Sequence, residues 1–326
     1  MSPSRRQFTV GLGLSLAGLG KHVGAQEVAA WPSRPVRIVV AYVPGGALDT
    51  AARMAAERLS AKWGQPVVVE NKPGASGTLG ADLVAKSTDG HTLLMSASPE
   101  MVIAPQTLQN VPYKPERDFA PIMLVCEFPF LLGVHGAIPV NSLQELIAYG
   151  KSRPEGLNYG SIGVGSASHL TGALFGARTG VPLTHVPYRG SGQMTTDLVG
   201  GQIQICFDTV PAILPHVAAG RLKAVAAATA RRTTVAPEIP TFAEAGIPDF
   251  VSSGWAGLMA PATTPPHVIA KVARDMAEIM RTEMAETLRA RGAEPKGTSP
   301  EEFQAFLLDE IPKWARMAQQ AGIRPS

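Results

Sequence analysis

Three times along this chain, a short apolar run leads into a glycine-rich loop and then into a helical pattern. The apolar runs are residues 36–41, 67–70 and 157–160, and the loops are 42–49, 71–80 and 161–169. Further strand signals alternate with helix-length segments almost throughout the sequence. Such alternation predicts open, parallel α/β sheets, in which ligands bind beyond the carboxyl ends of the strands. The glycine loops lie at those ends.

A glycine loop before a helix is a potential anion site. The first turn of a helix leaves backbone N–H groups unpaired, and the helix dipole is positive there. Glycine also has structural uses at such a turn, because it tolerates positive φ and allows close packing. Three such loops, with serines among them, favour a cleft that holds an acid.

The patterns predict the following elements. Strands are expected over 92–97, 122–126, 130–135, 183–187, 203–207, 222–228 and 255–260, besides the three named above. Helices are expected over 48–63, 78–86, 142–151, 193–198, 212–219, 266–291 and 299–321, and after Ser166. Capping boxes are expected at Ser142 with Glu145 and at Ser299 with Glu302.

The first 25 residues have the features of an export signal. Arg5 and Arg6 precede an apolar stretch through Leu19, and small residues up to Ala25 offer a cleavage site before Gln26. This arrangement is typical of a twin-arginine signal peptide, and the stretch is too short and glycine-rich to favour a membrane-spanning helix. We expect cleavage near Ala25 and a periplasmic protein.

Removal of this segment changes the charge balance. The whole chain has 29 basic and 26 acidic residues, and the loss of Arg5, Arg6 and Lys21 leaves 26 of each. The remaining chain is formally neutral and lacks interleaved aromatic and basic residues, which argues against nucleic-acid binding. Its length of about 300 residues exceeds what one hydrophobic core usually holds, so two lobes are expected.

Several enzyme motifs are absent from the sequence. It contains no Gly-x-Ser-x-Gly, His-Glu-x-x-His or Cys-x-x-Cys pattern, and no phosphate loop ending in Gly-Lys-Ser/Thr. The histidines form no close pair at ligand spacing, so we expect neither a metal nor a cofactor. Cys126 and Cys206 each lie in an apolar, strand-like run, which favours two separate buried thiols over a disulfide.

Three side chains near the loops are candidate site residues. Asp49 lies in a first helical turn, where it could stabilise the helix dipole or take part in a site. His169 lies one turn into its helix, and packing or capping competes with ligand contact as its role. Asp208 follows a strand and is interpreted as a hydrogen-bonding group that orients amides, waters or a ligand donor. Asp197, on a helix between strands, is expected to lie outside the site.

Ordered motifs run through essentially the whole chain after residue 25. They begin with Tyr42–Gly46 and Asp49, and continue at 64–75, 89–94, 118–122, 158–166, 185–190, 200–202 and 220–222. Together they resemble the Bug family, which consists of extracytoplasmic solute-binding receptors related to those of tripartite tricarboxylate transporters.

The resemblance implies a two-lobed, type II periplasmic-binding-protein fold, with a mostly parallel sheet flanked by helices in each lobe. The chain of this fold crosses between lobes twice, so lobe one would comprise residues 26–125 plus 229–326 and lobe two residues 126–228. Lobe one would hold a ligand carboxylate, partly through ordered water. The expected ligand-binding residues are Tyr42, Pro44, Gly45, Gly46, Ala47, Leu48, Asp49, Ala75, Ser76, Ser98, Ser161, Gly163, Gly165, Ser166, His169, Tyr188, Arg189, Gly190 and Asp208.

Three residues depart from the commoner family pattern. Val43 replaces proline or alanine, Ser76 stands where glycine is frequent, and Leu48 stands where a small polar residue is common. Because Leu48 would place an apolar side chain near the cleft, we expect a mono- or dicarboxylate with an aliphatic or aromatic body rather than a tricarboxylate.

The expected function is therefore capture of a small organic acid by a monomeric receptor without catalysis. The receptor would deliver the acid to membrane permease subunits of a tripartite tricarboxylate transporter. A secreted enzyme acting on a similar acid and a sensor that signals to a membrane kinase remain as alternatives.

Overall fold

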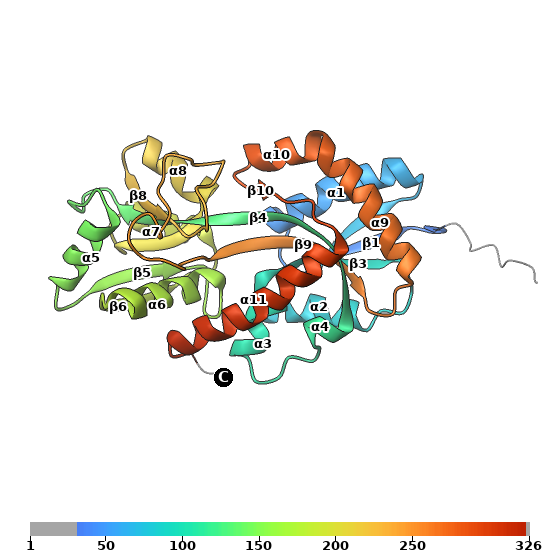
Figure 1. Cartoon of the computed structure of the whole chain (residues 1–326), viewed down its shortest axis with the longest axis horizontal. Coiled ribbons are helices and arrows are strands. Elements are labelled where there is room, and N and C mark those ends of the chain that lie inside the picture. The colour runs from blue at the N-terminus through green and yellow to red at the C-terminus, as the bar shows by residue number, and fades with distance from the viewer. Residues whose placement is uncertain (1–30, 324–326) are drawn as a thin grey trace, which may run out of the picture. The chain divides into compact units, whose positions relative to one another are not determined.

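The computed structural model describes residues 31–323, so the predicted signal peptide and its cleavage site lie outside the described residues (Figure 1). The strands are β1 (Val36–Val40), β2 (Val67–Asn71), β3 (Thr92–Ala97), β4 (Phe119–His135), β5 (Leu157–Ser161), β6 (Leu183–Pro187), β7 (Ile205–Thr209), β8 (Leu222–Ala227), β9 (Ser253–Pro261) and β10 (Glu294–Pro295). The α-helices are α1 (Ala47–Trp63), α2 (Thr78–Ala85), α3 (Ala104–Thr107), α4 (Pro115–Asp118), α5 (Leu143–Lys151), α6 (Ala167–Thr179), α7 (Ser191–Val199), α8 (Val210–Ala218), α9 (Pro266–Ile279), α10 (Ala285–Ala290) and α11 (Pro300–Gln320). Three further segments are the 3₁₀ helix η1 (Ala75–Gly77) and the π-helices η2 (Pro99–Ile103) and η3 (Met280–Met284).

The strands form one hydrogen-bonded path in the order β2-β1-β3-β9-β4-β7-β5-β6, with β8 and β10 also paired to β4. β1 is parallel to β2 and β3, and β5 is parallel to β6 and β7. β4 and β9 run antiparallel to their neighbours. The predicted two-lobed α/β class is confirmed, with a parallel group of strands on each side of the antiparallel pair.

The long strand β4 connects the two parallel groups. Residues 119–129 of β4 pair with β9, and residues 130–135 pair with β7 and β8. The sequence patterns predicted two separate strands here, but the backbone remains extended across residues 127–129 and one strand serves both groups (Figure 1). The predicted lobe boundary near Val125 falls inside β4, and the lobe boundaries stay a prediction.

Two predicted helix features differ in the structure. The helix expected over 266–291 is interrupted at η3, where Thr282 has non-helical dihedral angles and its hydroxyl donates to the carbonyl of Ile279 at 2.7 Å. Such a side-chain bond competes with the helical hydrogen-bond pattern. The capping box at Ser299 is confirmed, whereas at Ser142 only the serine half forms, because the Glu145 carboxylate accepts from the N–H of Asn141.

The interior is apolar and contains both cysteines. Cys126 on β4 and Cys206 on β7 are buried and unpaired, as the sequence favoured. The C-terminal helix α11 packs on β4, α6 and η2, and its Phe303 and Trp314 are fully buried. These contacts join segments from both parallel groups of strands in one core.

Candidate functional site

The parallel strands bring the predicted site residues together at two sheet edges. Because the carboxyl ends of parallel strands meet at one edge, the segments after β1, β2 and β3 form a first loop group. The segments after β5, β6 and β7 form a second loop group in the same way. The first loop group consists of Tyr42–Asp49, Ala75, Ser76 and Ser98, and the second of Ser161–Ser166, His169, Tyr188–Gly190 and Asp208.

Asp49 holds the first loop in shape. Its carboxylate accepts from the backbone N–H of Gly45 at 2.9 Å, from Arg53 Nε at 2.8 Å and from Asn71 Nδ2 at 2.9 Å. Burial opposes the ionised form, but these hydrogen bonds outweigh it and lower the pKa of Asp49 to about 2. With a side chain that is 2% exposed and fully engaged, Asp49 positions the loop.

The N-terminus of α1 presents free donors. Gly46 is the N-cap of α1, and no hydrogen bond within residues 31–323 engages the N–H groups of Gly46, Ala47 and Leu48. A Cβ atom built on Gly46 would meet nothing within 4 Å. Open space in front of unpaired N–H groups at the positive end of a 17-residue helix is suited to an anion.

One expectation for this loop needs correction. Leu48 packs into the core with α1 and β1, so it presents no apolar surface to a ligand. Gly46 has φ −74°, and the positive φ belongs to Gly45 at +89°. The exposed apolar residue of this loop is Val43, 63% exposed, which lies beside Pro44 and the glycines.

The loop after β2 has an unusual backbone. Gly74, Ala75, Ser76 and Gly77 have φ values of 137°, 47°, 55° and 89°. For alanine and serine this left-handed region costs roughly 1–2 kcal/mol per residue. The value at Ser76 also explains why glycine suits this position. Strained non-glycine residues that persist in a fold are common at ligand sites, and Ala75 and Ser76 are exposed here.

A buried acid supports both of these loops, and the sequence reasoning missed it. The hydroxyl of Tyr42 donates to Glu100 Oε2 at 2.6 Å, and the N–H of Ala97 donates to Glu100 Oε1 at 2.6 Å. A Cβ atom on Gly77 would come within 3.0 Å of both Glu100 Oε2 and Tyr42 Oη. Ser98, predicted as a ligand contact, is buried next to this pair. A lone glutamate after Ser98-Pro99 gives no sequence signal of burial.

The second loop group is built around two stacked histidines. The rings of His169 and His185 stack with centroids 4.0 Å apart, and His185 Nε2 lies 2.7 Å from the hydroxyl of Ser161. His169 Nδ1 accepts from the N–H of Gly165, which supports the loop-capping role considered for it. Burial lowers the pKa of both imidazoles, for His185 to about 4 with the nearby His169 as a second cause. Both rings are therefore neutral near pH 7.

This loop satisfies most of its own hydrogen bonds. Ser161 is fully buried, and its hydroxyl accepts from the N–H of Gly163. The hydroxyl of Ser166 donates to the carbonyl of Gly163 at 2.7 Å and accepts from the N–H of His169. Ser161 and Ser166 thus shape the loop, while the neighbouring Ile162 and Val164 are 43% and 71% exposed.

The remaining residues of the second loop group lie around the start of α7. Tyr188 is buried, and its hydroxyl donates to Asp197 Oδ2 at 2.9 Å, so Asp197 is linked to the predicted site despite the sequence expectation. Arg189 is exposed, and no hydrogen bond or ion pair engages its side chain within the described part of the chain. Gly190 has φ 152° and precedes Ser191, whose hydroxyl donates to the buried carboxylate of Asp208. Burial raises the pKa of Asp208.

The second loop group lies next to α3. A Cβ atom on Gly165 would lie 3.8 Å from the hydroxyl of Thr107, which belongs to the segment that follows Ser98 and η2. Val164, exposed on the second loop group, is the direct neighbour of this glycine. The geometry brings the second loop next to the chain segment that carries Glu100.

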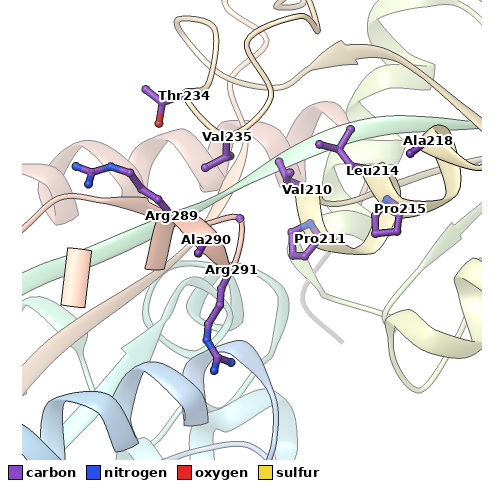
Figure 2. A pocket seen from close by; sticks show the side chains of 11 residues that line it. Val210, Pro211, Leu214, Pro215, Ala218, Thr234, Val235, Arg289, Ala290 and Arg291 are labelled. Carbon is purple, nitrogen blue, oxygen red and sulfur yellow. The ribbon is translucent and has the colours of Figure 1, made fainter. Parts of the chain in front are cut away.

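A pocket of about 770 Å³ adjoins the second loop group (Figure 2). Its apolar wall is the start of α8, directly after Thr209, and its opposite wall is the turn from α10 into β10. Figure 2 shows the guanidinium groups of Arg289 and Arg291 pointing away from each other, so they do not converge on one anion. None of the residues that line this pocket is among the predicted site residues.

Comparisons with known proteins show which family this chain belongs to. Residues 51–323 match the tripartite tricarboxylate transporter family receptor. Protein BugT of Bordetella pertussis is 36% identical over 99% of each chain. The structure of R. palustris Rpa4515 with adipate is 36% identical with a TM-score of 0.82, and the match covers 91% of this chain and 100% of that one.

Two further solved structures are similar. The periplasmic binding protein BugD is 32% identical with a TM-score of 0.78, over 91% of this chain and 100% of that one. MatC (Rpa3494) from Rhodopseudomonas palustris with bound malate is 33% identical with a TM-score of 0.76, over 88% and 99%. The chain therefore belongs to the tripartite tricarboxylate transporter receptor family, and the resemblance to Bug solute-binding receptors is confirmed.

Proposed function

We propose that the protein is a periplasmic receptor that binds a small carboxylate between two lobes and delivers it to membrane permease subunits. Lobe one is residues 26–125 plus 229–326, lobe two is residues 126–228, and the two loop groups supply the binding residues. The observation that carries the proposal is the N-terminus of α1, where the N–H groups of Gly46, Ala47 and Leu48 have no hydrogen-bond partner within residues 31–323 and the space beside Gly46 is open.

The ligand class follows from the apolar residues beside these donors. Val43 in the first loop group and Ile162 and Val164 in the second are exposed, and they replace Leu48 as the basis for an apolar ligand body. Similar proteins were solved with adipate and with malate. An aliphatic dicarboxylate fits both the donors and the apolar side chains, because each loop group could hold one end of the acid.

The experiment is a thermal-shift screen of the purified mature protein. Adipate, malate, succinate, benzoate and citrate are compared, with adipamide as the uncharged analogue of adipate. A ligand present at 100 times its dissociation constant stabilises the folded state by about 2.7 kcal/mol, which gives a clear rise in Tm. An acid that raises Tm while its amide does not supports the proposal, and a panel without any shift contradicts it.

Lobe closure and location have their own tests. Two lobes that each bind part of one acid close on it, so small-angle scattering with the bound acid should show a smaller radius of gyration.

Replacing Arg5 and Arg6 by lysine should keep the full-length protein in the cytoplasm. Within residues 31–323, no helix has the length and apolar character needed to cross a membrane.

The alternative of a secreted enzyme has one geometric feature in its favour. Ser161 and His185 form a serine–histidine hydrogen bond of 2.7 Å, as a nucleophile and its base would. Ser161 is 0% exposed, however, and its hydroxyl is engaged by Gly163, so it cannot reach a substrate in this conformation. Recovery of chemically unchanged adipate after incubation with the protein would reject the enzyme, and a co-purification of the permease subunits would test delivery.

A further inference from the structure

The carboxyl group of Glu100 is the most deeply buried acid beside the proposed site. The residue is 0% exposed, and no salt bridge reaches it from any described residue. Its carboxylate accepts hydrogen bonds from the Tyr42 hydroxyl and the Ala97 N–H, and the backbone of Glu100 itself contributes a further one. A buried carboxylate without a cation is costly to ionise, because hydrogen bonds replace only part of its lost hydration.

The groups around Glu100 add no positive charge. Tyr42 reaches it from the end of β1, and the Tyr113 hydroxyl donates to the backbone carbonyl of Glu100 at 2.7 Å. Asp82 on α2 acts on Tyr113 as a further negative charge, and the exposed Lys86 pairs with Asp82 at 2.7 Å rather than with Glu100. On α11, which packs on η2, Glu310 and Lys313 form an ion pair with each other. Burial accordingly raises the pKa of Glu100 to about 7, although the hydrogen bond from Tyr42 opposes this rise.

Glu100 is also coupled to the loops that would hold an anion. Tyr42, its hydrogen-bond partner, is followed within four residues by Gly46, the N-cap of α1. Gly77, which ends the strained loop after β2, leaves no room for a Cβ atom next to the Glu100–Tyr42 contact. A ligand carboxylate at the α1 N-terminus therefore binds to the loop that begins with Tyr42, the hydrogen-bond partner of an acid whose ionised form is already unfavourable. A second negative charge near a buried carboxylate raises the pKa of that carboxylate.

We propose that Glu100 takes up a proton when the first loop group binds a carboxylate, so that the receptor captures an acid anion together with a proton. This inference rests on the proposed function of the α1 N-terminus as an anion site. Protonated Glu100 can still accept the hydrogen bond from Tyr42, so the loop keeps its shape while the repulsion disappears. Binding then becomes tighter as the pH falls through the pKa of Glu100.

The test measures affinity for adipate, or for the panel acid with the largest thermal shift, between pH 6 and pH 8. Aliphatic carboxylates are ionised throughout this range, and burial lowers the pKa of both nearby imidazoles, His169 and His185, for His185 to about 4. If the complex requires the protonated acid, the parent binds about tenfold more weakly at pH 8 than at pH 6. Calorimetry at pH 7 in buffers of different ionisation heat should show uptake of about half a proton per bound acid.

Three variants separate this role from simple support of the loop. Glu100→Gln should bind with an affinity that changes less than about twofold over the same pH range, and without proton uptake. Tyr42→Phe removes a hydrogen bond that favours ionised Glu100, so the pH at which affinity falls should move upward. A merely structural Tyr42 would lower the affinity equally at every pH. The exposed Glu116→Gln is the matched control and should behave like the parent.

The ligand-free protein provides a second readout. Folding raises the pKa of Glu100, so the folded protein binds this proton more tightly than the unfolded chain. The free energy of unfolding of the parent should therefore decline as the pH rises from 5 to 7, and Glu100→Gln should lack this contribution. A panel without any binding acid would contradict the proposed function alone. If Glu100→Gln binds with the parent's pH dependence and proton uptake, or shows the parent's pH slope of unfolding, the inference about Glu100 is wrong.

Discussion

The side chain of Asp49 accepts a hydrogen bond from the backbone N–H of Gly45 at 2.9 Å, so the first turn of α1 folds the loop that precedes it. The same carboxylate is tied to Asn71 at the end of β2. The α1 N-terminus is thereby fixed against the neighbouring strand before any ligand arrives. Preorganised donors lose less conformational entropy on binding than donors on a mobile loop.

The replacement Asp49→Asn should destabilise the protein by about 2 kcal/mol at pH 7. This value follows from the pKa of Asp49, which folding lowers from 3.8 to about 2. A lowered pKa means that the stabilisation is present above the unfolded value and is lost as the pH falls through the folded value. Urea unfolding at pH 7 and at pH 3 measures the difference, which should shrink in acid. Asp309→Asn, at an exposed position of α11, is the control. A difference that stays constant from pH 7 to pH 3 would show that the ionised carboxylate is not the source.

The α1 N-terminus itself is tested by Gly46→Val. Since φ is −74° and a Cβ atom meets nothing within 4 Å, valine fits the backbone and adds its branched side chain where the anion is expected. Loss of two charge-assisted hydrogen bonds, each worth roughly 1.5–3 kcal/mol, should weaken affinity at least about a hundredfold. Calorimetric titration with the panel acid gives the affinity, and circular dichroism checks folding.

The matched control is Ala61→Val, which creates the same branched side chain at an exposed position near the opposite end of α1. It should leave affinity within severalfold of the parent. If folded Gly46→Val binds as tightly as the parent, this loop is only a structural turn and the proposed site is wrong.

Most element positions could be predicted from the sequence because local patterns determine them. Thr92–Ala97 and Leu183–Pro187 have the expected bounds, and Ser299 caps its helix as its spacing with Glu302 predicts. The single long strand β4 could not be predicted in this way. Its middle residues include Glu127 and Pro129, which are disfavoured in strands, and pairing with β9 from a distant part of the chain keeps residues 127–129 extended.

The contacts of the site residues, like the course of β4, depend on distant parts of the chain and could not be predicted from local patterns. The glycine loops were visible as local motifs, but the direction of a side chain depends on packing against distant elements. Leu48 therefore lies in the core, Glu100 supports the loops from a position without a local signal, and the role of His185 in its motif depends on Ser161 of a different strand. The hydrogen bond between Tyr188 and Asp197 spans nine residues and likewise depends on how α7 packs.

This last hydrogen bond supports a prediction about lobe two. Tyr188→Phe and Asp197→Ala should each destabilise the protein, because each removes one partner of a partly buried hydrogen bond to a carboxylate. In a double-mutant cycle of unfolding free energies the two changes should couple by about 1–2 kcal/mol. Additive effects, with coupling near zero, would show that the hydrogen bond does not hold the Tyr188–Gly190 turn and that Asp197 is independent of the site.

Ser76 offers a test of backbone strain near the ligand. Its φ of 55° is unfavourable for serine and free of strain for glycine, so Ser76→Gly relieves roughly 1–2 kcal/mol in the folded state. Glycine also gains entropy in the unfolded chain, which offsets about 0.4–1 kcal/mol. We expect a net stabilisation of about 0.5–1 kcal/mol in urea unfolding. Ser152 has φ −75° at the end of α5, so Ser152→Gly relieves no strain. This variant should destabilise the protein by the entropy difference alone, about 0.4–1 kcal/mol. If Ser76→Gly loses stability as Ser152→Gly does, the serine side chain makes a contact that outweighs the strain of its backbone.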